Sequence, residues 1–190
     1  VVRLGSALTL IAFAGVFLSE LCDPQSNFQN DRFIEIYNSG PDPVDLTGWS
    51  VVAVANNADV TTWSLSGTLP AGQARVCGTD VPITAFTVDF QNHLWFTTGY
   101  FNWNGRAGDG AKLIDNNSAV VDIVVATGIL FENADLVRIA TVSVPNPVYT
   151  PSEWTSTPVA LATSASPGTH NGSAPPPDGP RLSNIVTDPA

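Results

Sequence analysis

The sequence predicts an all-β protein, and three observations support this fold class. Short runs rich in β-branched and aromatic residues alternate in polarity, as in Thr61–Leu65, which is the pattern of a half-buried strand. Clusters of turn-forming residues separate these runs, and the chain contains 15 Gly and 15 Pro. Helical periodicity is absent from every window of useful length outside the N-terminal segment. With 190 residues, the chain is long enough for one β-sandwich with a proper core.

The stretch Phe33–Trp49 organises the rest of the chain. Its first part, Phe33–Tyr37, predicts a strand, and the turn-forming residues Asn38–Pro43 must end it. The apolar alternation resumes at Val44. Gly48 would let the backbone approach a neighbour closely, and Trp49 has enough apolar area to be the centre of a small core.

Further strands follow the same pattern. Val51–Ala55 leads into a turn at Asn56 and Asn57, and Leu136–Ala140 predicts another strand. A hairpin is predicted from Ala111–Ile114 to Ala119–Val125, with Asn at the positive-φ positions of the connecting Asp115–Ser118. The aromatic residues of Tyr100–Gly105 are expected to fill the core.

Several of these stretches, in this order, resemble the lamin tail domain family. The resemblance covers roughly residues 16 to 171 and rests on Phe17–Leu21, Ile34–Asn38, Leu46–Trp49, Gly67–Gly72, Gly108–Leu113, Val120–Asp122, Leu136–Arg138 and Ser166–Asn171. It implies an immunoglobulin-like β-sandwich, which hosts many functions and does not by itself select one. The expected organisation is an apolar N-terminal extension over 1–15, the sandwich over 16–172 and a Pro-rich C-terminal tail over 173–190.

Cys22 and Cys77 are the only cysteines. In the family pattern, Cys22 follows the strand that contains Ser19 and Glu20, and Cys77 ends the strand after the Leu69–Gly72 turn. An even pair in an exported protein is more often a disulfide than a metal site, and two thiols cannot complete a tetrahedral zinc site. We therefore expect a Cys22–Cys77 disulfide between two strands.

Charge and composition exclude some partners. The net charge is −10, and the seven basic residues are scattered along the sequence, so the basic patch needed for nucleic-acid binding is missing. A single Lys, no Met and a charged fraction of 13% are typical of processed proteins that are exported. We expect an extracellular or cell-surface location.

The N-terminal segment Val1–Gly15 has three interpretations. A basic residue, an apolar run and the small residues Ala12 and Ala14 resemble a secretory signal with its cleavage site. A membrane helix would have only about 15 apolar residues over 4–18, against the ~20 that a span needs. As a strand, the segment would be apolar on both faces and would have to be buried on both, for example against another copy of the chain.

Two segments are therefore candidates for joining copies of the chain by strand addition. In the first, the residues expected at the contact are Leu8, Leu10, Ile11, Phe13 and Val16. The second follows the polyproline-like stretch 173–180, and its candidate contact residues are Leu182, Ile185 and Val186.

A catalytic site is not predicted. The only histidines are His93 and His170, and the sequence has no nucleophile elbow or phosphate-binding glycine loop to accompany them. Glu20 and Glu35 lie on strands that could be neighbours, and paired acids can act as general acid and base; hydrogen bonding at strand ends is the simpler interpretation. We expect no catalytic residue, no cofactor and no small-molecule substrate.

Two kinds of modification or ligand are weakly indicated. Asp23, Asn27, Asn30 and Asp31 offer the hard oxygen ligands that calcium prefers, but they match no fixed loop spacing, and a solvated loop is the simpler explanation. Asn116 and Asn171 begin the glycosylation acceptor pattern.

Three functions are compatible with these features. The first is a structural, non-enzymatic subunit of an extracellular filament or surface polymer, whose copies join head-to-tail by strand addition. The second is a monomeric, secreted or cell-surface binding or adhesion module. The third is a surface protein anchored in a membrane by residues 1–18.

Overall fold

A computed structural model describes residues 15–93, 95 and 102–170 of the chain. The N-terminal extension as far as residue 14 and the Pro-rich tail lie outside these residues, as do Leu8, Leu10, Ile11, Phe13, Leu182, Ile185, Val186 and Asn171.

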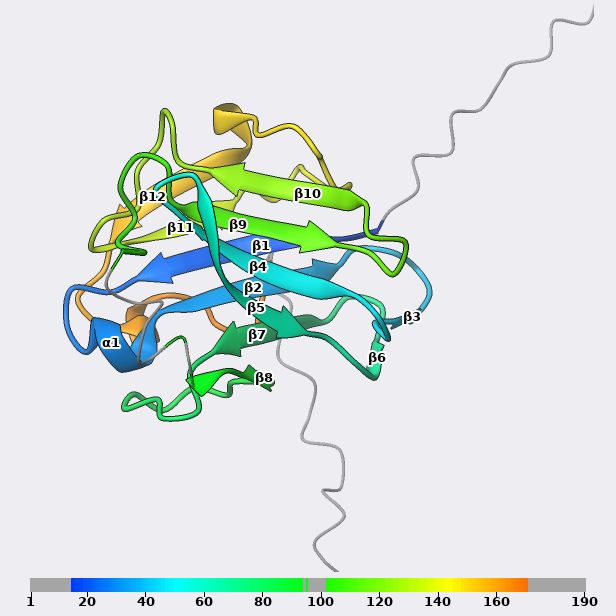
Figure 1. Ribbon diagram of the computed structural model, residues 1–190, viewed down its shortest axis with the longest axis horizontal. Helices are drawn as coiled ribbons and strands as arrows, with labels where there is room; N and C mark the ends of the chain where they lie inside the picture. Colours follow the sequence, from blue (N-terminus) through cyan, green and yellow to red (C-terminus); the bar gives the residue numbers. More distant parts are fainter. Residues whose placement is uncertain (1–14, 94, 96–101, 171–190) are drawn as a thin grey trace, which may run out of the picture.

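The predicted all-β class and the sandwich are confirmed. Two sheets pack face to face (Figure 1): a six-stranded sheet in the order β12-β11-β1-β2-β7-β8 and a four-stranded sheet in the order β10-β9-β4-β5. A two-stranded ribbon, β3-β6, lies at one end. All pairs are antiparallel except β7–β8.

The strands are short, as the closely spaced turn residues predict. Their bounds are β1 Val16–Asp23, β2 Phe33–Asn38, β3 Val44–Asp45, β4 Ser50–Ala55, β5 Ala58–Ser64, β6 Thr68–Leu69, β7 Ala74–Gly78, β8 Phe90–Gln91, β9 Gly110–Ile114, β10 Val120–Val125, β11 Ala134–Arg138 and β12 Trp154–Pro158. The chain also forms three single helical turns, α1 Phe28–Asp31, η2 Pro151–Glu153 and η3 Ala162–Ser164. Helix α1 falls in the segment 23–31, which the sequence had suggested was an irregular polar loop.

The turns follow the predicted chemistry with one exception. Asn56 and Asn57 both have positive φ, so β4 and β5 form a tight two-residue hairpin. In the hairpin between β9 and β10, the positive φ belongs to Ser118, not to an Asn. The Asp115 carboxylate there accepts the N–H groups of Asn117 and Ala119, which stabilises the turn.

A row of aromatic rings forms the centre of the core. Trp63, Trp95 and Trp103 are buried, and successive ring centroids lie 5.0 and 4.9 Å apart. The indole N–H groups of Trp63 and Trp103 donate to the carbonyls of Gly78 and Gly110. The expected core role of Trp103 is confirmed, whereas Trp49 is only half-buried at the edge of the core.

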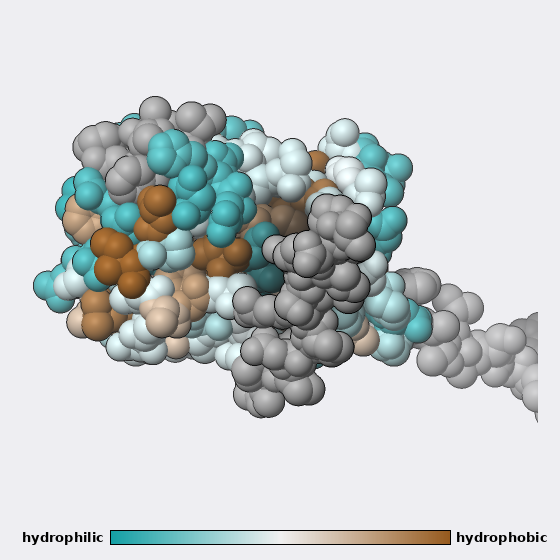
Figure 2. Space-filling model, turned by 90° about the horizontal axis from the view of Figure 1, so that it is seen from below, coloured by the Kyte–Doolittle hydropathy of each residue, from teal (hydrophilic) through white to brown (hydrophobic). Residues whose placement is uncertain are grey.

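The outer face of the six-stranded sheet is also covered. Alternate side chains of its strands point away from the four-stranded sheet, and residues 159–170 pack on them. Because residues 159–170 cover the face that points away from the four-stranded sheet, the centre of the six-stranded sheet is buried on both sides. Figure 2, which views the molecule from the side of β7 and β8, shows apolar residues in separate patches among polar ones.

Candidate functional site

Polar residues that are far apart in the sequence meet in two buried clusters. The first lies on the outer face of the six-stranded sheet and contains Glu20, Glu35 and Asp135; we refer to it as the carboxylate cluster. The second lies between the two sheets around Asp122 and Arg138, and we refer to it as the inter-sheet cluster.

The carboxylate cluster is positioned by the register of β1 and β2. A bulge between Leu18 and Glu20 shifts β1 by one residue, so Glu20 stands opposite Glu35. Leu18 and Leu21 then face the core, while Glu20 faces outward. The prediction that the two glutamates lie on neighbouring strands is confirmed.

Both glutamates hold the turn that ends the described chain. Glu20 accepts the N–H of Ser166 at 2.8 Å and its hydroxyl at 2.7 Å. Glu35 accepts the N–H of Gly168 at 2.6 Å and the hydroxyl of Ser19, also at 2.6 Å. Residues 166–168 are therefore fastened to β1 and β2 at two points.

Burial changes the protonation of this cluster. It raises the pKa of Glu20 and, with the nearby Glu20 charge, raises the pKa of Glu35 well above its ordinary value. Burial and the same charge raise the pKa of Asp135 to about 9. Asp135 is therefore protonated at neutral pH and hydrogen-bonds to Glu20, which allows several acids to share one buried site.

This geometry does not suit catalysis. Glu20 and Glu35 are 1% and 0% exposed, so a substrate cannot reach either carboxyl group. Hydrogen bonding to the turn accounts for the paired acids. His170 packs against the rings of Phe17 and Tyr37, and burial lowers its pKa to about 4, so it is neutral at physiological pH.

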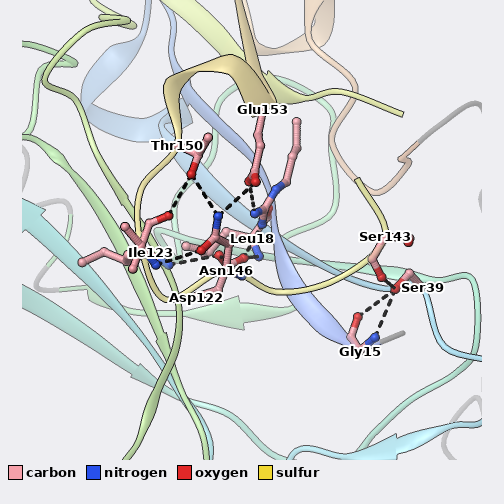
Figure 3. A network of polar contacts seen from close by, with 11 residues as sticks. Gly15, Leu18, Ser39, Asp122, Ile123, Ser143, Asn146, Thr150 and Glu153 are labelled. Atoms are coloured by element: carbon pink, nitrogen blue, oxygen red, sulfur yellow. Dashed lines mark hydrogen bonds and ion pairs between the residues drawn. The ribbon is translucent and has the colours of Figure 1, made fainter. Parts of the chain in front are cut away.

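The inter-sheet cluster joins the two layers of the sandwich (Figure 3). Asp122 Oδ2, on β10, lies 2.5 Å from the Arg138 guanidinium on β11 and accepts the N–H of Leu18 on β1 at 2.8 Å. Arg138 also reaches Glu153 at 2.5 Å, and its guanidinium lies over the ring of Trp154. Burial raises the pKa of Asp122, and Arg138 partly offsets this effect.

The same cluster holds the loop that precedes β12. Asn146 donates its N–H to Asp122 Oδ1 at 3.0 Å, and its side chain donates to Thr150 and Glu153 (Figure 3). Its carbonyl accepts the N–H of Ile123, at the outer edge of β10. One buried aspartate thus connects β1, β10, β11 and this loop.

The expected disulfide is wrong. Cys22 and Cys77 are both free, buried thiols. Cys22 pairs with Phe33 and Cys77 with Ile34, which are successive residues of β2 and therefore face opposite sides of the sheet. With β2 between them, the two strands are about 9.5 Å apart, beyond the reach of a disulfide.

Three of the four candidate calcium ligands have separate partners. Asp23 forms an ion pair with Arg32 at 2.5 Å, so its charge is already matched. Asp31 accepts the N–H groups of Ile83 and Thr84, and the Asn30 amide donates to the Val81 carbonyl. Asn27 begins α1 with a positive φ. Within the described ranges, no group of three His, Cys, Asp or Glu residues could hold a metal ion.

The remaining candidates are dispersed. His93 lies at the surface beside Asp80, at 2.9 Å. Asn116 is exposed at the tip of the β9–β10 hairpin, where a glycan could be accommodated. Val16 is buried in β1 and pairs with Asn38 of its own sandwich, so it is not available as a donor residue for another copy.

The roles of Asp122, Asp135 and Arg138 were not predicted from the sequence. All three are charged residues within otherwise apolar strands, and that departure from the strand pattern was the available signal. The pattern of a single strand could not identify the partners of these residues, because the partners lie on different strands.

The fold is an immunoglobulin-like β-sandwich. Its two buried polar clusters hold the closing turn at residues 166–168 and the loop before β12 that contains Asn146. The sequence model of the Lamin Tail Domain family matches residues 11–128, and the chain belongs to this family. The closing turn at 166–168 lies beyond the matched residues. Neither a curated protein nor a solved structure matches the chain.

Lamin tail domains are binding and structural domains. In the part of the chain that the structure describes, no helix is long and apolar enough to cross a membrane.

Proposed function

We propose that this protein is a non-enzymatic structural and binding module displayed outside the cell or on its surface, with a sandwich that is complete in one copy. The observation that carries the proposal is the use of its buried charged residues: the carboxylate cluster and the inter-sheet cluster hold backbone groups of the same chain. Buried groups with this role stabilise a scaffold, and the exposed surface is left for recognition.

Two of the sheet edges, β12 and β10, support a module that does not recruit further strands. The backbone N–H of Ile139 donates to the Glu153 carbonyl, and that of Val159 donates to the Asn133 carbonyl. The backbone N–H and C=O groups of the odd-numbered residues along β12 therefore point toward β11. Of the even-numbered residues, Pro158 has no N–H and the N–H of Trp154 already donates to Pro151. At β10, the N–H of Ile123 is occupied by Asn146. Such features protect edges from pairing with other chains.

A filament subunit is the second candidate, and one edge favours it. Strand β5 is an edge strand, and its first three residues, 58–60, are exposed, with Val60 37% exposed. A segment from a second copy could pair there, and the apolar N-terminal segment 1–15 or the tail residues 181–187 are the candidate donors. Copies of the chain would then join head-to-tail.

Light scattering after size exclusion, with negative-stain imaging, separates the two candidates. The full chain is expected to elute as one species of about 20 kDa, as the 20.0 kDa chain mass requires for a monomer. Deleting residues 1–14 should leave that species unchanged, and so should deleting residues 173–190. Fibres that disappear on either deletion, or on Val60→Lys, would select the filament instead, because a charge on an edge strand opposes pairing.

A further inference from the structure

A surface cleft of about 460 Å³ lies beside α1, away from both polar clusters. Gln25 and Gln29 line it, together with Asn104 and Asn133 from two distant segments, and Phe28 provides an aromatic ring. Its walls therefore offer four primary amides, each with donors and an acceptor in one plane.

The charges in this cleft are balanced. Arg32 pairs with Asp23, and Arg106 pairs with Glu132, both at 2.5 Å. Since each guanidinium has a carboxylate partner, the cleft carries no net charge from these four residues. A phosphate or another polyanion would find no surplus positive charge here, and the chain as a whole carries −10.

Phe28 is the aromatic element of the cleft. It is 40% exposed, and the Arg32 guanidinium lies 4.9 Å from its ring centroid. The exposed part of this ring offers apolar surface that complements the C–H groups of a sugar ring, while planar amides and ion-paired side chains match pairs of hydroxyl groups.

The backbone that carries two of the amides is held by hydrogen bonds. The backbone N–H of Asn104 donates to Asp109 at 2.7 Å, and the backbone N–H of Asn133 donates to Asp23 at 3.3 Å. Arg106 contacts Glu132 through two nitrogens. Pre-ordered groups lower the entropic cost of binding.

We propose that this cleft binds a neutral carbohydrate. Its balanced charge disfavours ionic ligands, and its many amides disfavour a purely apolar one. A polyhydroxylated ligand with a stackable ring matches both the amides and Phe28.

The test is calorimetric titration of the full chain with neutral hexasaccharides, namely cellohexaose, xylohexaose, mannohexaose, maltohexaose and chitohexaose. At least one should bind, and Phe28→Ala should weaken that binding by about tenfold or more, which corresponds to ~1.4 kcal/mol. Phe28→Tyr should retain it. Ile83→Ala, which trims a side chain of a residue that is 62% exposed and outside the cleft, is the matched control and should bind like the parent.

Three results would overturn the proposal: no hexasaccharide binds at millimolar concentration, Phe28→Ala binds as well as Ile83→Ala, or hexagalacturonate binds more tightly than every neutral sugar. Circular dichroism melts of each variant establish that the sandwich is intact. Since oligomeric state does not enter these measurements, the carbohydrate proposal can fail while the proposed module or filament stands.

Discussion

Glu20 and Glu35 stand opposite each other on β1 and β2, and each accepts the N–H of a residue in one turn more than 130 positions later in the chain. Two facing carboxylates would repel each other if both were ionised. Burial and proton sharing with Asp135 remove that repulsion, so acidic residues can serve as the attachment point for residues 166–168.

Replacing Glu35 should loosen this attachment. Glu35→Ala leaves the Gly168 N–H and the Ser19 hydroxyl without their acceptor, and we expect a loss of about 2–3 kcal/mol in the free energy of unfolding at pH 5. At pH 8 the loss should be smaller, because the raised pKa of Glu35 makes the parent less stable as the pH rises. Urea denaturation measures both values.

Glu132→Ala is the control for this experiment, since it removes a surface carboxylate that pairs with an exposed Arg106. It should leave the urea midpoint unchanged. A Glu35→Ala midpoint equal to that of Glu132→Ala would show that the turn is held by other contacts.

Asp135 should make stability fall as pH rises. Its pKa is about 9 in the folded state and 3.8 in an unstructured chain, so the folded state binds the extra proton between these values. Stability from this group is fully present below pH 3.8 and decreases up to about pH 9. Asp135→Asn keeps a donor for Glu20 and removes the titration. As the pH rises from 5 to 8, the free energy of unfolding of this variant should increase by about 2–4 kcal/mol relative to that of the parent.

The measurement is the urea midpoint of parent and variant across this pH range. Asp42→Asn, an exposed substitution, should keep the slope of the parent. Parallel pH profiles for the parent and Asp135→Asn would contradict the shifted pKa.

The Asp122–Arg138 pair should be strongly coupled. Arg138→Met leaves the buried Asp122 carboxylate without its cation and should cost about 3–5 kcal/mol. The double variant Asp122→Asn, Arg138→Met should cost at least ~1 kcal/mol less than the sum of the single variants. Denaturant titration completes the double-mutant cycle, and Arg138→Lys provides a folded variant if Arg138→Met does not fold. Additivity within ~0.5 kcal/mol would exclude direct coupling.

Both cysteine thiols should be unreactive in the native protein. Burial raises the pKa of Cys22 and of Cys77, so neither is a ready thiolate at neutral pH. A thiol-specific reagent should label neither in the native protein, and both in denaturant. Reducing agent should leave the melting temperature unchanged. One or no thiol released on denaturation would mean that a disulfide forms after all.

The sequence predicted the strands well where local chemistry decides them. Phe33–Tyr37 has the strand pattern, and Asn56 and Asn57 tolerate the positive φ of a tight hairpin, so both predictions hold. Tertiary contacts decided the rest. Trp49 and Trp103 are the same residue type, and only the packing of the two sheets makes Trp103 central.

The candidate sites were harder to predict for the same reason. The parity that puts Cys22 and Cys77 on opposite faces depends on strand pairing, which spacing alone does not specify. The cleft beside α1 likewise combines Gln25 with Asn104 and Asn133, and no local pattern joins these residues.

The β9–β10 hairpin provides a test of backbone strain. Ser118 has a φ of 65°, in the left-handed region that favours glycine, after a turn closed by its N–H donating to the Asp115 carbonyl. Ser118→Gly should therefore stabilise the protein by about 0.5–1 kcal/mol, because glycine adopts this conformation without steric cost. Asn117→Gly is the matched control. Asn117 has no positive φ, so glycine there only adds freedom to the unfolded chain and should destabilise it slightly. Thermal melts in which the two variants shift in the same direction would show that Ser118 is not strained.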